Sequence, residues 1–86
     1  MDGDLLMIFG IVANSEAAFE SECDSRGLDV NEVYCISNIA DFNFMTSETQ
    51  DSTITVFFSY DSYETCVNPR FIHENVKKHN SKSKKG

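Results

Sequence analysis

The first apolar segment of the chain covers residues 5–13 and is interrupted by Gly10. A short, nearly continuous apolar run that is rich in branched side chains is typical of a strand covered on both faces. A glycine inside such a run marks a bulge or a close contact with another part of the chain. The sequence therefore predicts a strand over residues 5–13.

A helix is predicted over residues 15–26 from signals at both of its ends. Ser15 supplies a side-chain oxygen that can cap the first turn, and Glu16 is favourable at the positive amino end of a helix. Gly27 can adopt the left-handed conformation that ends many helices, which would bring Leu28 back onto Cys23.

Apolar residues recur at every second position in residues 33–44 and again in residues 53–60. A period of two is typical of a strand with one covered face. A polar stretch over residues 46–52 separates the two segments. We therefore expect a β-hairpin with a long loop, whose first strand bends near Asp41.

The end of the chain predicts one more helix and a tail. Asn68 and Pro69 suit the cap and the first helical position, and Phe71, Ile72 and Val76 form an apolar stripe. Residues 79–86 have no apolar anchor, so we expect a disordered basic tail there.

These elements predict one α+β domain over residues 1–78 with the order β-α-β-β-α. Its three-stranded sheet would be mainly antiparallel, with two helices on one face. Because two short helices leave one sheet face thinly covered, we also expect a homodimer that pairs sheet edges or covers that face. The core is expected to contain Phe9, Ile11, Phe19, Ile36, Phe42, Ile54, Val56, Phe58, Ile72 and Val76.

Charge divides the chain near Arg70. Residues 1–69 contain thirteen acidic residues and one basic residue, Arg26. Residues 70–86 contain six basic residues, Arg70 among them, and one acidic residue, Glu74. The formal net charge of -7 therefore conceals a much more acidic body. Such a body repels nucleic acid and anionic membranes, and it attracts basic proteins.

The amino terminus does not predict export, because it lacks a positive n-region and its apolar run is less than half a membrane span. Cys23, Cys35 and Cys66 are an odd set at long intervals, unlike a secreted disulfide framework. We expect a cytoplasmic protein with reduced thiols and no contact with a membrane.

Signatures of catalysis and of metal binding are absent from the sequence. The three cysteines, His73 and His79 lack the spacing of a zinc site, and there is no glycine-rich phosphate loop. The acidic surroundings disfavour a reactive thiolate at Cys66. We expect no metal, no cofactor and no enzymatic activity. The Lys-rich end either binds phosphates or acts as a solubilising terminus.

The carboxylates of residues 15–26 are the strongest candidates for a binding site. Glu16, Glu20 and Asp24 recur every four residues, so they line one helix face at a rise of about 6 Å per step. Their repulsion weakens the helix, which leaves two interpretations: a solvated face or a selected acidic surface. The predicted partner-binding residues are Glu16, Glu20, Glu22, Asp24, Asp29, Glu32, Asp41, Glu48 and Asp51.

In size, acidity and the series Glu16, Glu20 and Asp24, the chain resembles small acidic phage-encoded inhibitors that mimic DNA, including inhibitors of bacterial HU (histone-like) proteins. The resemblance implies a non-enzymatic protein that blocks the DNA-binding surface of a basic host protein in the bacterial cytoplasm, with carboxylates standing in for phosphates. The Lys-rich end departs from that pattern. The alternative is an adaptor or inhibitor of a host enzyme or RNA polymerase that binds through a sheet edge or an apolar surface, with charge serving solubility.

Overall fold

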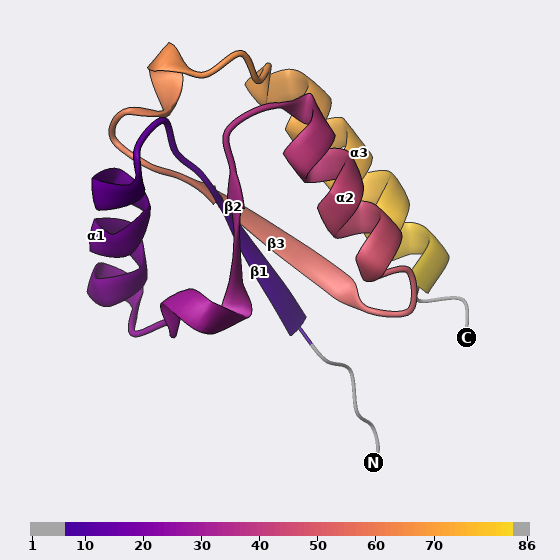
Figure 1. Ribbon diagram of the computed structural model, residues 1–86. Coiled ribbons are helices and arrows are strands. Elements are labelled where there is room, and N and C mark those ends of the chain that lie inside the picture. Colours follow the sequence, from indigo (N-terminus) through magenta and orange to yellow (C-terminus); the bar gives the residue numbers. More distant parts are fainter. Residues whose placement is uncertain (1–6, 84–86) are drawn as a thin grey trace.

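The computed structural model describes residues 7–83, which form a three-stranded parallel sheet and three helices (Figure 1). The strands are β1 (Met7–Val12), β2 (Val33–Ile36) and β3 (Thr53–Phe58). The helices are α1 (Glu16–Arg26), α2 (Ile39–Glu48) and α3 (Pro69–Ser83), and the short 3-10 turns η1 (Val30–Glu32) and η2 (Ser62–Glu64) precede β2 and α3. The central strand β1 pairs in parallel with β2 on one side and with β3 on the other.

The expectation of a mainly antiparallel sheet is wrong. β1 lies between β2 and β3, so residues 33–44 and 53–60 do not form a hairpin. Residues 39–44, expected in the first strand of that hairpin, belong to α2. Because parallel strands need a crossover connection, this helix carries the chain from β2 across to β3.

The cap of α2 explains why this segment is helical. The side chain of Asn38 accepts a hydrogen bond from the backbone N–H of Asp41 at 2.9 Å, and the Asp41 carboxylate accepts one from the backbone N–H of Ser37 at 3.0 Å. Phe42 and Met45 are buried about one turn apart. Phe44, which alternation would place on the covered face with Phe42, is 59% exposed. The aromatic residues that suggested a period of two thus lie on different sides of a helix.

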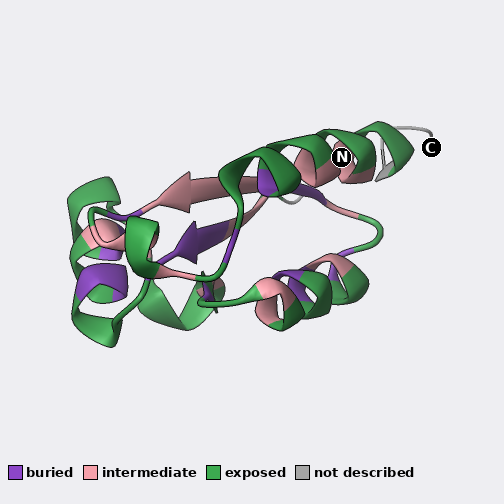
Figure 2. Cartoon of the chain, turned by 90° about the horizontal axis from the view of Figure 1, so that it is seen from above, coloured by how far each residue is buried: buried purple, intermediate pink, exposed green. Residues whose placement is uncertain are grey.

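Helices cover both sheet faces, so the expectation of two helices on one face is also wrong. On one face, residues of α1 pack against Ile11 of β1 and against Ala13, which follows that strand. On the other face, Val12 of β1 packs with Phe42 of α2 and Ile72 of α3. Figure 2 shows buried residues gathered on the central strand and exposed residues on the outer sides of the helices. The core is therefore two clusters separated by the sheet.

Except for Phe9, the core residues predicted from the sequence lie in these two clusters or against them, and Phe9 stacks on Phe57. Ile11, Phe19, Ile36, Phe42, Ile54 and Ile72 are buried, and Phe9, Val56, Phe58 and Val76 are half-buried. The expected homodimer stays a prediction. Its physical basis is weaker than the sequence suggested, because helices pack on both faces of the sheet.

The prediction of α1 is confirmed at both ends. The Ser15 hydroxyl oxygen accepts a hydrogen bond from the backbone N–H of Ala18 at 3.2 Å. Gly27 has φ 70°, and the backbone N–H of Leu28 donates to the carbonyl oxygen of Cys23 at 2.8 Å. This is the expected left-handed ending.

Strands are confirmed within residues 5–13 and 53–60, as β1 and β3. Leu5 and Leu6 lie outside the described residues. Gly10 marks a close contact, since a Cβ atom added there would lie 2.8 Å from the sulfur of Met45. The missing side chain lets α2 pack directly on the central strand.

The last helix continues beyond the boundary that the sequence suggested at Lys78. Residues 79–83, expected in a disordered tail, belong to α3, and residues 84–86 lie outside the described part of the chain. Two polar side chains anchor this extension. His79 lies within hydrogen-bond distance of the Thr49 and Ser52 carbonyl oxygens, and Asn80 bonds to the backbone of Ile54. Polar anchoring of this kind leaves no apolar period in the sequence.

Candidate functional site

The outer face of α1 presents a row of carboxylates to solvent. Ala18, Phe19 and Cys23 are the buried residues of this helix and pack on the sheet. Glu16, Glu20 and Asp24 are all exposed. The predicted four-residue spacing therefore gives a solvent-facing acidic row.

Glu22 differs from the other α1 carboxylates because Arg26 compensates its charge. The two side chains form an ion pair with a distance of 3.1 Å between Arg26 Nη2 and Glu22 Oε1. The Arg26 guanidinium also lies 4.0 Å from the centre of the Phe57 ring, in a cation–π contact. Glu22 thus contributes less to the acidic field than its neighbours do.

At the carboxyl end of the sheet, the loop after β3 lies beside the amino end of α1 (Figure 1). A second group of polar side chains joins these two segments. The Asp61 carboxylate accepts hydrogen bonds from the backbone N–H of Asn14 at 2.9 Å, from the Ser15 hydroxyl at 2.8 Å and from the Ser59 hydroxyl at 2.6 Å. Glu64 accepts one from the side-chain amide of Asn14 at 3.1 Å. These bonds fix the loop after β3 to the start of α1.

The hydrogen bonds to Asp61 also decide what this end of the sheet can bind. Donation from Ser59 above all, and from the Asn14 N–H, holds the pKa of Asp61 below its ordinary value. In parallel sheets flanked by helices, ligands bind outside the carboxyl ends of the strands, and anions favour helix amino ends. Here the protein's own carboxylate occupies the anion position beside α1. The arrangement therefore opposes a phosphate ligand at that place.

The structure brings together most of the predicted partner-binding residues. Asp29 caps η1 and Glu32 is its last residue; this turn follows α1 in the chain and is exposed. Asp41 lies near the carboxyl end of the sheet. Burial is the main reason that the pKa of the Cys35 thiol is raised; a hydrogen bond with Ser37 opposes the rise, and the charges of Asp41, Glu16 and Asp61 add to it. We call the set of Glu16, Glu20, Glu22, Asp24, Asp29, Glu32, Asp41, Asp61 and Glu64 the acidic surface.

Two predicted residues lie elsewhere, and two acidic residues were missed. Glu48 and Asp51 lie at and after the end of α2, on the sheet face opposite α1. Asp61 and Glu64 join the acidic surface through their bonds to Ser15 and Asn14. No local signal in the sequence separates Glu48 and Asp51 from the acidic surface or adds Asp61 and Glu64 to it, because both results depend on the order of the strands.

Basic side chains collect on the opposite side of the molecule. Arg70, Lys77, Lys78 and Lys82 all lie on α3, which packs on the sheet face away from α1. Within the described residues, Arg26 is the one basic residue outside α3. The division of charge in the sequence is thus also a division in space.

The cysteines and the possible metal ligands were the other candidate groups in the sequence. Burial raises the pKa of the Cys23 thiol, and nearby acidic groups raise it further, which disfavours the nucleophilic thiolate. Among residues 7–83, no three His, Cys, Asp or Glu side chains are placed to share a metal ion. The described helices also lack the length and apolar character that crossing a bilayer requires.

Comparison of the chain with protein-family models, with curated proteins and with solved structures finds no match. The proposals below therefore depend on the geometry of this chain and on the resemblance in acidic character described above.

Proposed function

We propose that the chain is a non-enzymatic binding protein whose acidic surface binds a basic DNA-binding protein and blocks its DNA-binding surface. An HU-like nucleoid protein is the first candidate partner. The supporting observation is the separation of charge. The acidic surface covers α1, η1 and the carboxyl end of the sheet, whereas the described basic residues other than Arg26 lie across the sheet on α3. A basic partner can therefore approach the side of the molecule that carries α1 without being repelled by the basic residues of α3.

The scaffold under the carboxylates supports this proposal. α1 is held at its amino end by the cap of Ser15 and by Asp61, and at its other end by the left-handed turn at Gly27. Side chains on a fixed helix lose less freedom on binding than side chains on a loop do. The backbone positions of Glu16, Glu20 and Asp24 are therefore fixed relative to one another.

Competition with DNA is expected because electrostatic attraction to basic side chains drives both kinds of binding. Non-specific DNA binding is mainly electrostatic and depends on basic side chains of the protein. An acidic protein surface attracts the same side chains and can exclude the duplex while it occupies them. The proposed setting is the one the resemblance implies, a phage-encoded inhibitor acting on a host protein in the bacterial cytoplasm.

The proposal is tested by displacement of a fluorescently labelled DNA duplex from a purified HU-like protein. We expect the chain to release the DNA, and we expect binding of the chain to its target, measured directly, to weaken steeply between about 50 and 200 mM salt. Failure to release DNA from any basic nucleoid protein at either salt concentration would contradict the proposal.

A second candidate function is strand addition to a host enzyme or RNA polymerase, and one observation restricts it to a single edge. The side chain of Asn80 bonds to both the N–H and the carbonyl oxygen of Ile54, at 2.7 and 2.9 Å, and so blocks part of the β3 edge. The β2 edge carries no such contact among the described residues. Pairing there would depend on backbone hydrogen bonds, so its affinity should change little with salt.

A further inference from the structure

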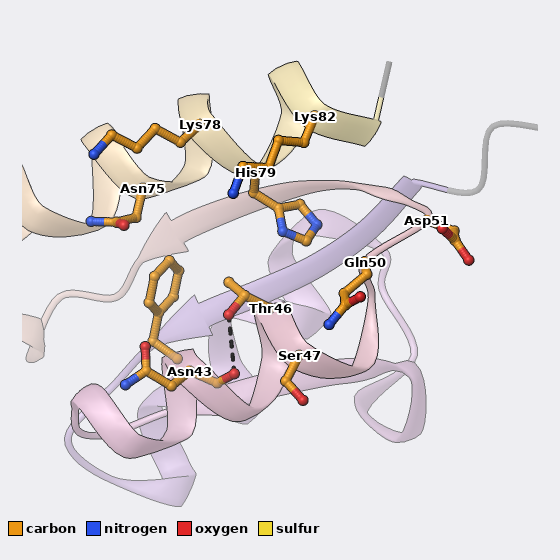
Figure 3. A pocket seen from close by; sticks show the side chains of 10 residues that line it. Asn43, Thr46, Ser47, Gln50, Asp51, Asn75, Lys78, His79 and Lys82 are labelled. Carbon is orange, nitrogen blue, oxygen red and sulfur yellow. Dashed lines mark hydrogen bonds between the residues drawn. The ribbon is translucent and has the colours of Figure 1, made fainter. Parts of the chain in front are cut away.

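A groove of about 600 Å³ runs between α2 and α3, on the sheet face opposite α1 (Figure 3). This volume is in the range of small-molecule sites. Phe42 is the aromatic residue of its lining, and the other lining residues are polar or charged. The groove is therefore suited to a small polar ligand. Since it lies away from the acidic surface, what it binds is independent of the proposed function.

The walls of the groove are held at a fixed separation. His79 Nε2 of α3 lies 2.8 Å from the Thr49 carbonyl oxygen and 2.9 Å from the Ser52 carbonyl oxygen, just beyond the end of α2. Nearer the start of both helices, the rings of Phe42 and Phe71 meet edge to face, with centres 6.0 Å apart. A groove braced at two places needs little rearrangement to bind a ligand.

Two lysines give the groove positive charge. Lys78 and Lys82 lie four residues apart on α3, and neither forms an ion pair with another described residue. Like charges at this spacing repel each other. A bound anion would relieve that repulsion and accept hydrogen bonds from the ammonium groups.

The two ends of the groove differ. Figure 3 shows Asn43, Asn75 and Lys78 toward one end and Asp51 at the other. The Asn75 side-chain amide donates one hydrogen bond to the Phe71 carbonyl oxygen at 2.8 Å, which leaves its second N–H available. Asp51 and the negative carboxyl end of α2 disfavour an anion at their end. The donors near Lys78 are thus the place for a single oxyanion.

We propose that this groove binds a small polar molecule that carries one phosphate-type oxyanion. The oxyanion lies beside Lys78 and the side-chain amide of Asn75 on α3, and Lys82 adds a second positive charge. A hydroxyl or amino group of the ligand is directed toward Asp51. A ligand that is anionic along its whole length, such as a nucleic-acid strand, would meet repulsion from Asp51.

The test uses NMR titration of the full ¹⁵N-labelled chain with inorganic phosphate and then with phosphoethanolamine, which adds an amino group. We expect saturable shifts of the backbone signals that line the groove, with tighter binding of phosphoethanolamine. Lys78→Gln should weaken both ligands by about tenfold, the loss of one charge-assisted contact. Lys77→Gln is the matched control, because it removes the same charge from the neighbouring residue, which does not line this groove.

Three results would overturn the inference. The first is the absence of saturable shifts at the groove with either ligand. The second is equal weakening by Lys77→Gln and Lys78→Gln, which would mean that phosphate only screens the charge of α3. The third is tighter binding of a short single-stranded DNA than of phosphoethanolamine with equal sensitivity to both variants, which would identify α3 as a general basic face.

Discussion

The Asp61 carboxylate accepts the backbone N–H of Asn14 at 2.9 Å and so joins two loops that are 47 residues apart in the chain. The contact connects the end of β3 to the start of α1. It places a negative charge at the amino end of the helix that carries the acidic row.

Asp61→Asn is expected to destabilise the fold at neutral pH, because an amide cannot accept all the hydrogen bonds that reach this carboxylate. The native-state pKa of Asp61 lies below its ordinary value, chiefly because the Ser59 hydroxyl and the Asn14 N–H donate to the carboxylate. A lowered pKa contributes stability that is complete above the unfolded-state pKa and is lost as the pH falls through the native-state pKa. Urea unfolding midpoints of parent and variant should therefore differ at about pH 7 and converge at an acidic pH below the native-state pKa of Asp61.

The control for this prediction is Asp51→Asn, which removes the same charge from an exposed site. It should leave the midpoint nearly unchanged at both pH values. A difference between Asp61→Asn and the parent that stays constant with pH would show that the carboxylate charge is not the cause.

Gly27→Ala should lower the free energy of unfolding by about 1 kcal/mol, since a residue with a Cβ is strained at φ 70°. Apart from Gly27 and its two chain neighbours, no atom lies within 4 Å of the position that the added Cβ would take, so the loss reports backbone strain. Chemical denaturation measures it. Ser25→Ala, at an exposed position of α1, is the comparison, and an equal loss in both variants would refute the left-handed ending.

Asn80→Ala removes the two hydrogen bonds to Ile54 and should cost about 1 to 2 kcal/mol. Hydrogen exchange of the Ile54 amide should accelerate more than that of the other β3 amides. Ser81→Ala, at the next and exposed position of α3, provides the control. Unchanged exchange at Ile54 would show that residues 79–83 are not anchored to the sheet.

Local signals in the sequence were sufficient for α1 because both of its ends depend on residues within the segment, Ser15 and Gly27. The same was not true of α2. Its apolar residues also fit a period of two, and the cap formed by Asn38 and Asp41 was the signal that favoured a helix. Interpreting α2 as part of a strand also gave the wrong strand orientation. It replaced the crossover that joins parallel strands by a hairpin, which joins antiparallel strands.

The candidate site was predictable where it lies on one element and unpredictable where it depends on topology. The row of Glu16, Glu20 and Asp24 follows from helical spacing alone. Asp61 reaches this row because β1 and β3 are neighbours in a parallel sheet, which ends both strands at the same side. Asp51 is separated from it because α2 lies on the other sheet face. Placing Asp61 in the acidic surface and Asp51 outside it therefore required a correct prediction of the strand order.

The position of the charges, and not their sum, is tested by comparing two triple variants in the DNA-displacement assay. Glu16→Gln with Glu20→Gln and Asp24→Asn removes the α1 row. Glu48→Gln with Asp51→Asn and Glu74→Gln removes the same charge from α2, the following loop and α3. The α1 variant should need at least about tenfold more protein to release half of the DNA, and the control should stay within about twofold of the parent. Equal behaviour of the two variants would contradict a binding site on α1.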